Sequence, residues 1–198
     1  MDTSEPAPMK NRTTMERKSE RELVVTRTLD GPARIVFEAW TKPELLKRWW
    51  APRSTGMSLL SCEADVRVGG RYRFEFGHEA FSKPMAFFGK YLEVTPPSRL
   101  VWTNEESDDG AVTTVTFQEK GGKTLLVMHE LHPSKEALDR SIAGMEGGMP
   151  ETFAQLDELL VPWARAWDGD EVVDPAAGRP APRYAEENRD EVVKAARP

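Results

Sequence analysis

The sequence predicts an α+β domain in which a curved antiparallel sheet of about six or seven strands wraps around a long C-terminal helix, with two short helices after the first strand. Three patterns support this prediction. Residues 71–76 (RYRFEF) alternate charged and aromatic side chains with the period of a strand. Short β-branched and apolar runs on either side are separated by Gly-Gly and Pro-Pro turns. Between residues 138 and 160, apolar side chains recur every three or four positions, as on one face of a helix.

The first strand is expected at residues 22–29, an apolar and β-branched run that ends at the breaker sequence of residues 30–32 (DGP). Two short helices are expected next. Residues 35–40 carry apolar side chains at helical spacing, and Pro43 stands at the first position of a second helix over 44–50.

The middle of the chain predicts the rest of the sheet. Gly69-Gly70 and Gly121-Gly122 are typical of hairpin turns. Strands are expected at residues 57–68, 71–76, 85–94, 99–104, 111–118 and 123–132.

The last element is a helix that Ser134 is expected to cap at its N-terminus. Three glycines and Pro150 interrupt its middle, which predicts a kink or a short break near residues 147–150. Its apolar stripe consists of Leu138, Ile142, Met145, Met149, Phe153, Leu156 and Leu160.

The composition predicts one domain at residues 21–160. Residues 1–20 hold prolines, hydroxyl side chains and mixed charges but little to bury, which is typical of a disordered N-terminal arm. Residues 161–198 form a Pro-rich, charged C-terminal tail, in which Trp163 and Trp167 are unusual.

Charge and cysteine content exclude several classes of protein. A net charge of −6 and a pI near 5.3 argue against a general nucleic-acid binder, since an acidic surface repels phosphate. Cys62 is the single cysteine, so no disulfide forms within one chain and a cytoplasmic location is expected. No window approaches the roughly 18 apolar residues that a membrane span needs, and the N-terminus has no apolar core of a secretory signal.

A sheet and a helix that diverge at one end leave a gap, and inward-facing aromatic and methionine side chains are expected to line it. The alternative is a fully packed core made of the same residues. Met145 and Met149 favour a cavity, because flexible thioethers adapt to varied ligand shapes. The candidate lining residues are Trp40, Trp49, Trp50, Tyr72, Phe74, Phe76, Phe88, Trp102, Val115, Phe117, Met128, Met145, Met149 and Phe153.

Glu130 is the main polar candidate for this cavity, on the same strand face as Met128 and His132. A carboxylate there would orient a ligand or act as a base. The alternative places Glu130 at the rim, paired with an arginine. Tyr91 and Asn104 are further polar candidates.

No metal or other cofactor is expected. His129 and His132 point to opposite faces of a strand, and their spacing is not that of the helical H-E-x-x-H motif. No glycine-rich phosphate loop and no G-x-S-x-G elbow occurs. Cys62, in the middle of a strand, is interpreted as an inert thiol.

Six segments, taken in order, resemble one superfamily: VTRTL and VFEAWT within residues 25–41, LKRWWAP (46–52), VGGRYRF (68–74), GKYLEVTPPSRLVWT (89–103) and FAQLDELL (153–160). They resemble the SRPBCC, or START-like, superfamily, and within it the branch named for the activator of heat-shock protein 90 ATPase. The resemblance implies a helix-grip fold with a cavity between sheet and long helix. Members of the superfamily bind lipids, sterols or polyketides, and some catalyse cyclisation or dehydration. Because these functions differ, the resemblance implies no shared set of catalytic residues. The tail at 161–198 has no counterpart in the family pattern.

Three hypotheses for function remain. The first is binding of a small hydrophobic or aromatic molecule, which a mostly apolar cavity would favour. The second is a cyclase- or aromatase-like enzyme that uses a cavity carboxylate, which a pair of buried ionisable residues in hydrogen-bond contact would favour. The third is a chaperone-interacting, co-chaperone-like module, which a solid core and a large exposed apolar patch would favour. Exposed sheet edges are also compatible with a homodimer.

Overall fold

The structure is a computed structural model that describes residues 13–167 except 81, 107–109 and 146–147, together with 173–174 and 179–180. Side chains are described as far as residue 161. Residues 1–12 of the predicted arm, residues 107–109 and most of the predicted tail lie outside the described residues.

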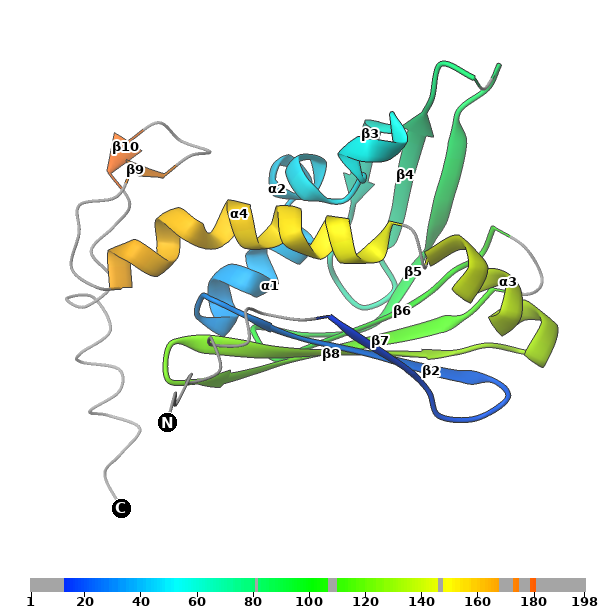
Figure 1. Cartoon of the computed structure of the whole chain (residues 1–198), viewed down its shortest axis with the longest axis horizontal. Helices are drawn as coiled ribbons and strands as arrows, with labels where there is room; N and C mark the ends of the chain where they lie inside the picture. The colour runs from blue at the N-terminus through cyan, green and yellow to red at the C-terminus, as the bar shows by residue number, and fades with distance from the viewer. Residues whose placement is uncertain are drawn as a thin grey trace, which may run out of the picture.

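An antiparallel sheet of eight strands forms the body of the domain (Figure 1), in the order β1-β2-β8-β7-β6-β5-β4-β3. The α+β fold with two short helices after the strand at 22–29 is confirmed. The strands are β1 (Thr14–Arg17), β2 (Glu22–Leu29), β3 (Ser58–Ala64), β4 (Arg71–Gly77), β5 (Met85–Thr95), β6 (Arg99–Thr103), β7 (Val112–Lys120) and β8 (Lys123–Leu131). A separate two-stranded sheet consists of β9 (Val173–Asp174) and β10 (Arg179–Pro180).

The helices lie on one side of the curved sheet. Figure 1 shows α4 crossing the sheet, with α1 and α2 beside it and α3 over one end of β7 and β8. The helical segments are α1 (Ala33–Thr41), α2 (Pro43–Trp49), the short 3₁₀ helix η1 (Arg53–Thr55), α3 (Lys135–Met145) and α4 (Met149–Trp167).

Strand β1 is the eighth strand, where composition predicts a disordered arm. Its four residues pair antiparallel with β2, Met15 opposite Val25. The guanidinium of Arg27 donates a hydrogen bond of 2.6 Å to the Thr13 hydroxyl. Backbone pairing at a sheet edge needs no apolar pattern, so a polar segment such as TMER forms a strand without a signal in its sequence.

Strand β3 is shorter than predicted, because the chain turns at residue 65. The Asp65 amide donates to the Arg71 carbonyl at 2.9 Å, and the Gly70 amide donates to the Arg67 carbonyl at 2.8 Å. These bonds close a turn over residues that the sequence assigns to the strand. At the other predicted hairpin, Gly121 and Gly122 both have positive φ, at 60° and 73°, which side chains with a Cβ rarely adopt.

The long C-terminal helix is divided where its sequence predicts a break. Helix α3 ends at Met145 and α4 begins at Met149. The Ser134 hydroxyl accepts a hydrogen bond of 3.1 Å from the Ala137 amide, as expected of an N-cap. The two helices therefore cover different parts of the sheet.

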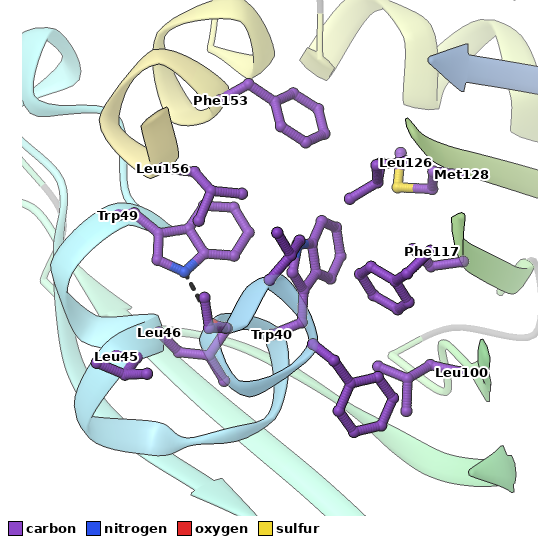
Figure 2. Close-up of a cluster of buried hydrophobic side chains, with 14 of the residues drawn as sticks. Trp40, Leu45, Leu46, Trp49, Leu100, Phe117, Leu126, Met128, Phe153 and Leu156 are labelled. Atoms are coloured by element: carbon purple, nitrogen blue, oxygen red, sulfur yellow. Dashed lines mark hydrogen bonds between the residues drawn. The ribbon is translucent and has the colours of Figure 1, made fainter. Parts of the chain in front are cut away.

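An apolar cluster joins α1, α2 and α4 to the sheet, with Trp40 at its centre (Figure 2). The Trp49 indole donates a hydrogen bond of 2.9 Å to the Ala39 carbonyl, which satisfies the one polar atom of that buried side chain. Leu46 and Leu156 are fully buried on either side of Trp49.

Helix α4 is also fastened by hydrogen bonds to the segment after α2. The Gln155 side-chain amide donates to the carbonyls of Trp49 and Ala51 at 2.8 and 2.9 Å, and its oxygen accepts from the Arg53 amide at 3.0 Å. No helix among the described residues is both long and apolar enough to cross a membrane.

Candidate ligand-binding cavity

A cavity of about 730 Å³ lies between the inner face of the sheet and helices α3 and α4. This volume is in the range of pockets that enclose small organic ligands. Aromatic and methionine side chains form most of its wall, and polar side chains gather along β6, β7, β8 and α3.

Three tryptophans from α1 and the end of α2 form the aromatic wall. The ring of Trp40 lies 5.1 Å from that of Trp49 and 5.3 Å from that of Trp50. Trp50 in turn lies 6.0 Å from Phe74 on β4. Because Trp49 and Trp50 stand at the end of a short helix, one packs in the core and the next reaches across to the sheet.

The alternation of β4 places Tyr72, Phe74 and Phe76 on the inner face, where all three are buried and line the cavity. Arg71 and Arg73 point outward and are exposed. Burial raises the pKa of the Tyr72 phenol well above its usual range, and the nearby Glu106 carboxylate adds to the shift. The phenol therefore keeps its proton and acts as a hydrogen-bond donor.

The hydroxyl of Tyr72 begins a row of hydrogen-bonded polar groups. It lies 2.8 Å from the Asn104 side-chain oxygen and 2.9 Å from the Thr103 carbonyl oxygen. The Asn104 amide donates to the Thr113 hydroxyl at 3.2 Å. Thr113 stands directly opposite Glu130 in the pairing of β7 with β8.

Glu130 on β8 and His132 just after this strand form a buried ionisable pair. The Glu130 carboxylate lies 3.1 Å from His132 Nε2, and both residues line the cavity. Only 6% of Glu130 and 5% of His132 is exposed. The rim position and arginine partner considered for Glu130 are therefore not what the structure has.

The mouth of the cavity is marked by lining residues that are exposed. Arg140, Ala143 and Gly144 lie on one side of it, on α3. Phe87 on β5 and Glu106 after β6 are also exposed lining residues. Apart from its chain neighbours and the backbone of its own helix, a Cβ added at Gly144 would meet no described atom within 4 Å.

All but three of the side chains proposed from sequence line this cavity. They are Trp40, Trp49, Trp50, Tyr72, Phe74, Phe76, Trp102, Met128, Glu130, Met145, Met149 and Phe153. Tyr91 and Asn104 line it as well. Contact of any of them with a ligand stays a prediction.

Phe88, Val115 and Phe117 are not among the lining residues. Phe88 faces the other side of β5, where Arg73 stacks on its ring at 5.7 Å, and Phe87 takes the inner position beside Phe74. Val115 and Phe117 are buried in the core, Phe117 against Phe37 of α1 at 5.5 Å. Two adjacent aromatic residues give no alternation from which to choose the inner one.

Several polar residues of the site have weaker signals in the sequence. Thr113 shares the inward parity of Val115, which could have identified it. Arg140 is exposed on α3, outside the apolar stripe that identifies the inner face of that helix. Glu106 lies after β6, outside any strand or helix, where no local pattern indicates the direction of a side chain. The buried indole N–H of Trp40 has no hydrogen-bond partner among the described residues, and nothing in the sequence indicates this.

The chemistry of the site is that of hydrogen bonding and apolar contact. Among the residues described, no three His, Cys, Asp or Glu side chains are grouped so as to hold a metal ion. A buried carboxylate beside an imidazole is equipped to accept and donate protons or hydrogen bonds.

Comparison with known proteins gives one family. The model of the family described as Activator of Hsp90 ATPase homolog 1-like protein matches residues 30–161. No curated protein matches the chain.

Solved structures from several bacteria share the fold. Protein NE0264 from Nitrosomonas europaea is 26% identical, with a TM-score of 0.66, and the match covers 74% of this chain and 97% of that one. A Rhodobacter sphaeroides protein is 23% identical with a TM-score of 0.69, covering 75% and 97%. An AHSA1-like protein from Aeromonas hydrophila is 22% identical with a TM-score of 0.57, covering 68% and 92%. The latter two similarities concern the fold alone.

Proposed function

This chain belongs to the Activator of Hsp90 ATPase homolog 1-like family, within the SRPBCC superfamily, and we propose that its domain binds a small hydrophobic or aromatic molecule between sheet and helices. The observation that carries the proposal is the cavity of about 730 Å³ with its aromatic and methionine wall. Apolar surface of this kind gains free energy when a ligand replaces water. Trp40, Trp50 and Phe74 supply flat contact surfaces, and Met145 and Met149 supply adaptable ones.

A neutral fluorescent dye tests this proposal. N-phenyl-1-naphthylamine becomes brighter in apolar surroundings, so its fluorescence rises when it enters the cavity. The substitution Gly144→Phe places a large side chain at the mouth, where a Cβ meets no other atom. It also replaces a glycine inside a helix with a residue of higher helix propensity, so we expect the variant to fold.

We expect Gly144→Phe to weaken dye binding about tenfold, equivalent to about 1.4 kcal/mol. Glu136→Phe is the matched control, because Glu136 is exposed on the same helix but does not line the cavity. It should bind the dye as the wild-type protein does. Absence of any fluorescence increase with the wild type, or equal affinities in all three proteins, would refute the proposal.

A second candidate function is acid–base catalysis on the bound molecule, and the Glu130–His132 pair favours it. The reaction class with the required chemistry is base-promoted cyclisation of a di- or triketone. It is tested by following ring formation by ultraviolet absorbance with wild type, Glu130→Gln and the control Glu22→Gln, which alters a half-buried carboxylate that does not line the cavity. A rate above that of buffer that Glu130→Gln alone abolishes supports catalysis, and a rate equal to that of buffer argues against it.

A further inference from the structure

We infer that a row of polar side chains, Tyr72, Asn104, Thr113, Glu130 and His132, forms a subsite for a neutral hydroxyl group at one end of the ligand. We call this row the polar strip. The preferred ligand is then a flat apolar or aromatic molecule that carries a phenol or an alcohol. This inference rests on the proposed function and specifies the class of molecule that the cavity takes.

The polar strip joins residues of β4, β7 and the end of β8 through Asn104, which follows β6. Tyr72 of β4 contacts Asn104 after β6 at 2.8 Å, and Asn104 contacts Thr113 of β7 at 3.2 Å. Thr113 and Glu130 are cross-strand neighbours with side chains on the same inner face. Glu130 contacts His132 at 3.1 Å, and all five residues line the cavity.

The end of the strip has hydrogen-bonding capacity left over. Each carboxylate has two oxygens and each imidazole two nitrogens, but within the described part of the chain the side chains of Glu130 and His132 bond only to each other. Both are more than nine-tenths buried, and both face the cavity. Because both residues line the cavity, their remaining oxygen and nitrogen atoms are available to a ligand that carries a matching donor or acceptor.

A hydroxyl group matches the remaining positions. It donates one hydrogen bond to a carboxylate oxygen and accepts one from a donor, and the pair offers both an acceptor and, in the appropriate tautomer, a donor. An anionic head group fits poorly, because Glu130 and Glu106 both contribute carboxylates to the lining. Arg140 on α3 is the cation among the lining residues, and it lies at the exposed mouth.

The tryptophans and the polar strip come from different elements around the cavity, and this arrangement would orient a ligand. Trp40, Trp49 and Trp50 come from α1 and the end of α2, whereas Glu130 and His132 come from the end of β8 beside α3. A molecule with its rings among the tryptophans then presents its polar end to the strip.

Three pyrene derivatives test this inference: 1-hydroxypyrene, 1-methoxypyrene and 1-pyrenecarboxylate. Their ring systems are the same, and only the hydroxyl compound carries a neutral donor. Binding is measured by quenching of tryptophan fluorescence, since four tryptophans line the cavity: Trp40, Trp49, Trp50 and Trp102. We expect the wild-type protein to bind 1-hydroxypyrene about tenfold more tightly than 1-methoxypyrene, because a site built for a hydroxyl rejects the analogue that lacks it.

The double variant Glu130→Leu/His132→Phe removes the pair and replaces it with apolar side chains, a replacement that often leaves stability unchanged when the new side chains pack well. We expect it to bind the two neutral compounds equally. The matched control is Glu22→Leu/His129→Phe, which removes a similar pair, 3.1 Å apart, from the outer face of β2 and β8. The control should keep the tenfold preference, and Glu130→Leu, which removes the acceptor, serves in place of the double variant if that variant does not fold.

The outcomes separate this inference from the function on which it rests. Equal binding of the hydroxyl and methoxy compounds by the wild type leaves a binding cavity but overturns the hydroxyl subsite. Tightest binding of the carboxylate also overturns it, and assigns head-group recognition to Arg140. Failure of all three compounds to bind overturns the inference, while the dye titration decides separately whether the cavity binds apolar molecules.

Discussion

Tyr72 and Tyr91 illustrate how burial controls the chemistry of single residues in this cavity. Both phenols are buried on the inner face of the sheet, and burial raises the pKa of each well above the usual value for tyrosine. The raised pKa keeps Tyr72 in the form that donates to Asn104 or to the Thr103 carbonyl. The Tyr72 phenol, at the start of the polar strip, is therefore expected to stay protonated as long as the domain is folded.

The alkaline titration of the protein should reflect these raised pKa values. An unfolded phenol ionises near pH 10, whereas the folded state keeps Tyr72 and Tyr91 protonated. The unfolded state thus releases protons first, so folding stability is lost as the pH rises above about 10. We expect phenolate absorbance from these two residues to appear together with loss of the circular dichroism of the fold. A phenolate signal that appears in the wild-type protein before the fold is lost, and that is absent from Tyr72→Phe, would contradict the raised pKa of Tyr72.

Strand parity predicts inner residues well where the sequence alternates. In β4 the alternation of RYRFEF assigns three aromatic side chains to the cavity, as the structure has them. In β5, Phe87 and Phe88 are adjacent, so parity depends on pairing with β4, which the sequence does not reveal. The contact between Glu130 and His132 is also not predictable from the sequence, because two side chains on one strand face meet only in particular rotamers.

At the scale of elements, Gln155 joins α4 to the segment that carries Trp49 and Trp50. Its side chain satisfies three backbone groups, the carbonyls of Trp49 and Ala51 and the amide of Arg53. The chain leaves helical geometry after α2, so these groups have no helical partner. One buried glutamine therefore fixes the aromatic wall of the cavity to α4.

The substitution Gln155→Leu should destabilise the domain by about 2–3 kcal/mol, because it leaves buried backbone groups without partners. Urea unfolding measures the change. Glu158→Gln is the matched control, since Glu158 is on the same helix and forms an exposed ion pair with Arg53. Exposed pairs contribute little, so the control should be close to wild type. Equal effects of the two substitutions would show that Gln155 does not hold the wall.

The elements that the sequence predicts are those with an apolar period of their own. The break between α3 and α4 is predicted from local glycines and a proline, because those residues weaken a helix wherever it packs. Strand β1 is missed because its pairing with β2 uses backbone groups that every sequence possesses. The role of Gln155 is not predicted, because hydrophobic periodicity identifies buried apolar positions and gives no signal for a buried polar side chain.

At the scale of the whole molecule, the cavity lies between the sheet and two separate helices, α3 and α4. Helix α4 packs against α1 and α2 through Trp49 and Leu156, and α3 covers the end of the sheet near His132. Tyr72, Met128 and neighbouring side chains line the space between the helices and the sheet. Sequence patterns predict this architecture, whereas the volume and the polarity of the cavity depend on distances between elements that no local pattern contains.

The central claim, that this cavity receives a small apolar molecule, is tested most directly by nuclear magnetic resonance of methionine methyl groups. Of the eight methionines, Met57, Met128, Met145 and Met149 line the cavity, whereas Met15 and Met85 are described residues that do not. On titration with N-phenyl-1-naphthylamine, the account predicts saturable shift changes at the four lining methyl groups, with Met15 and Met85 unchanged. Changes at Met85 and Met15 without changes at Met128, Met145 and Met149, or no changes at all, would contradict it.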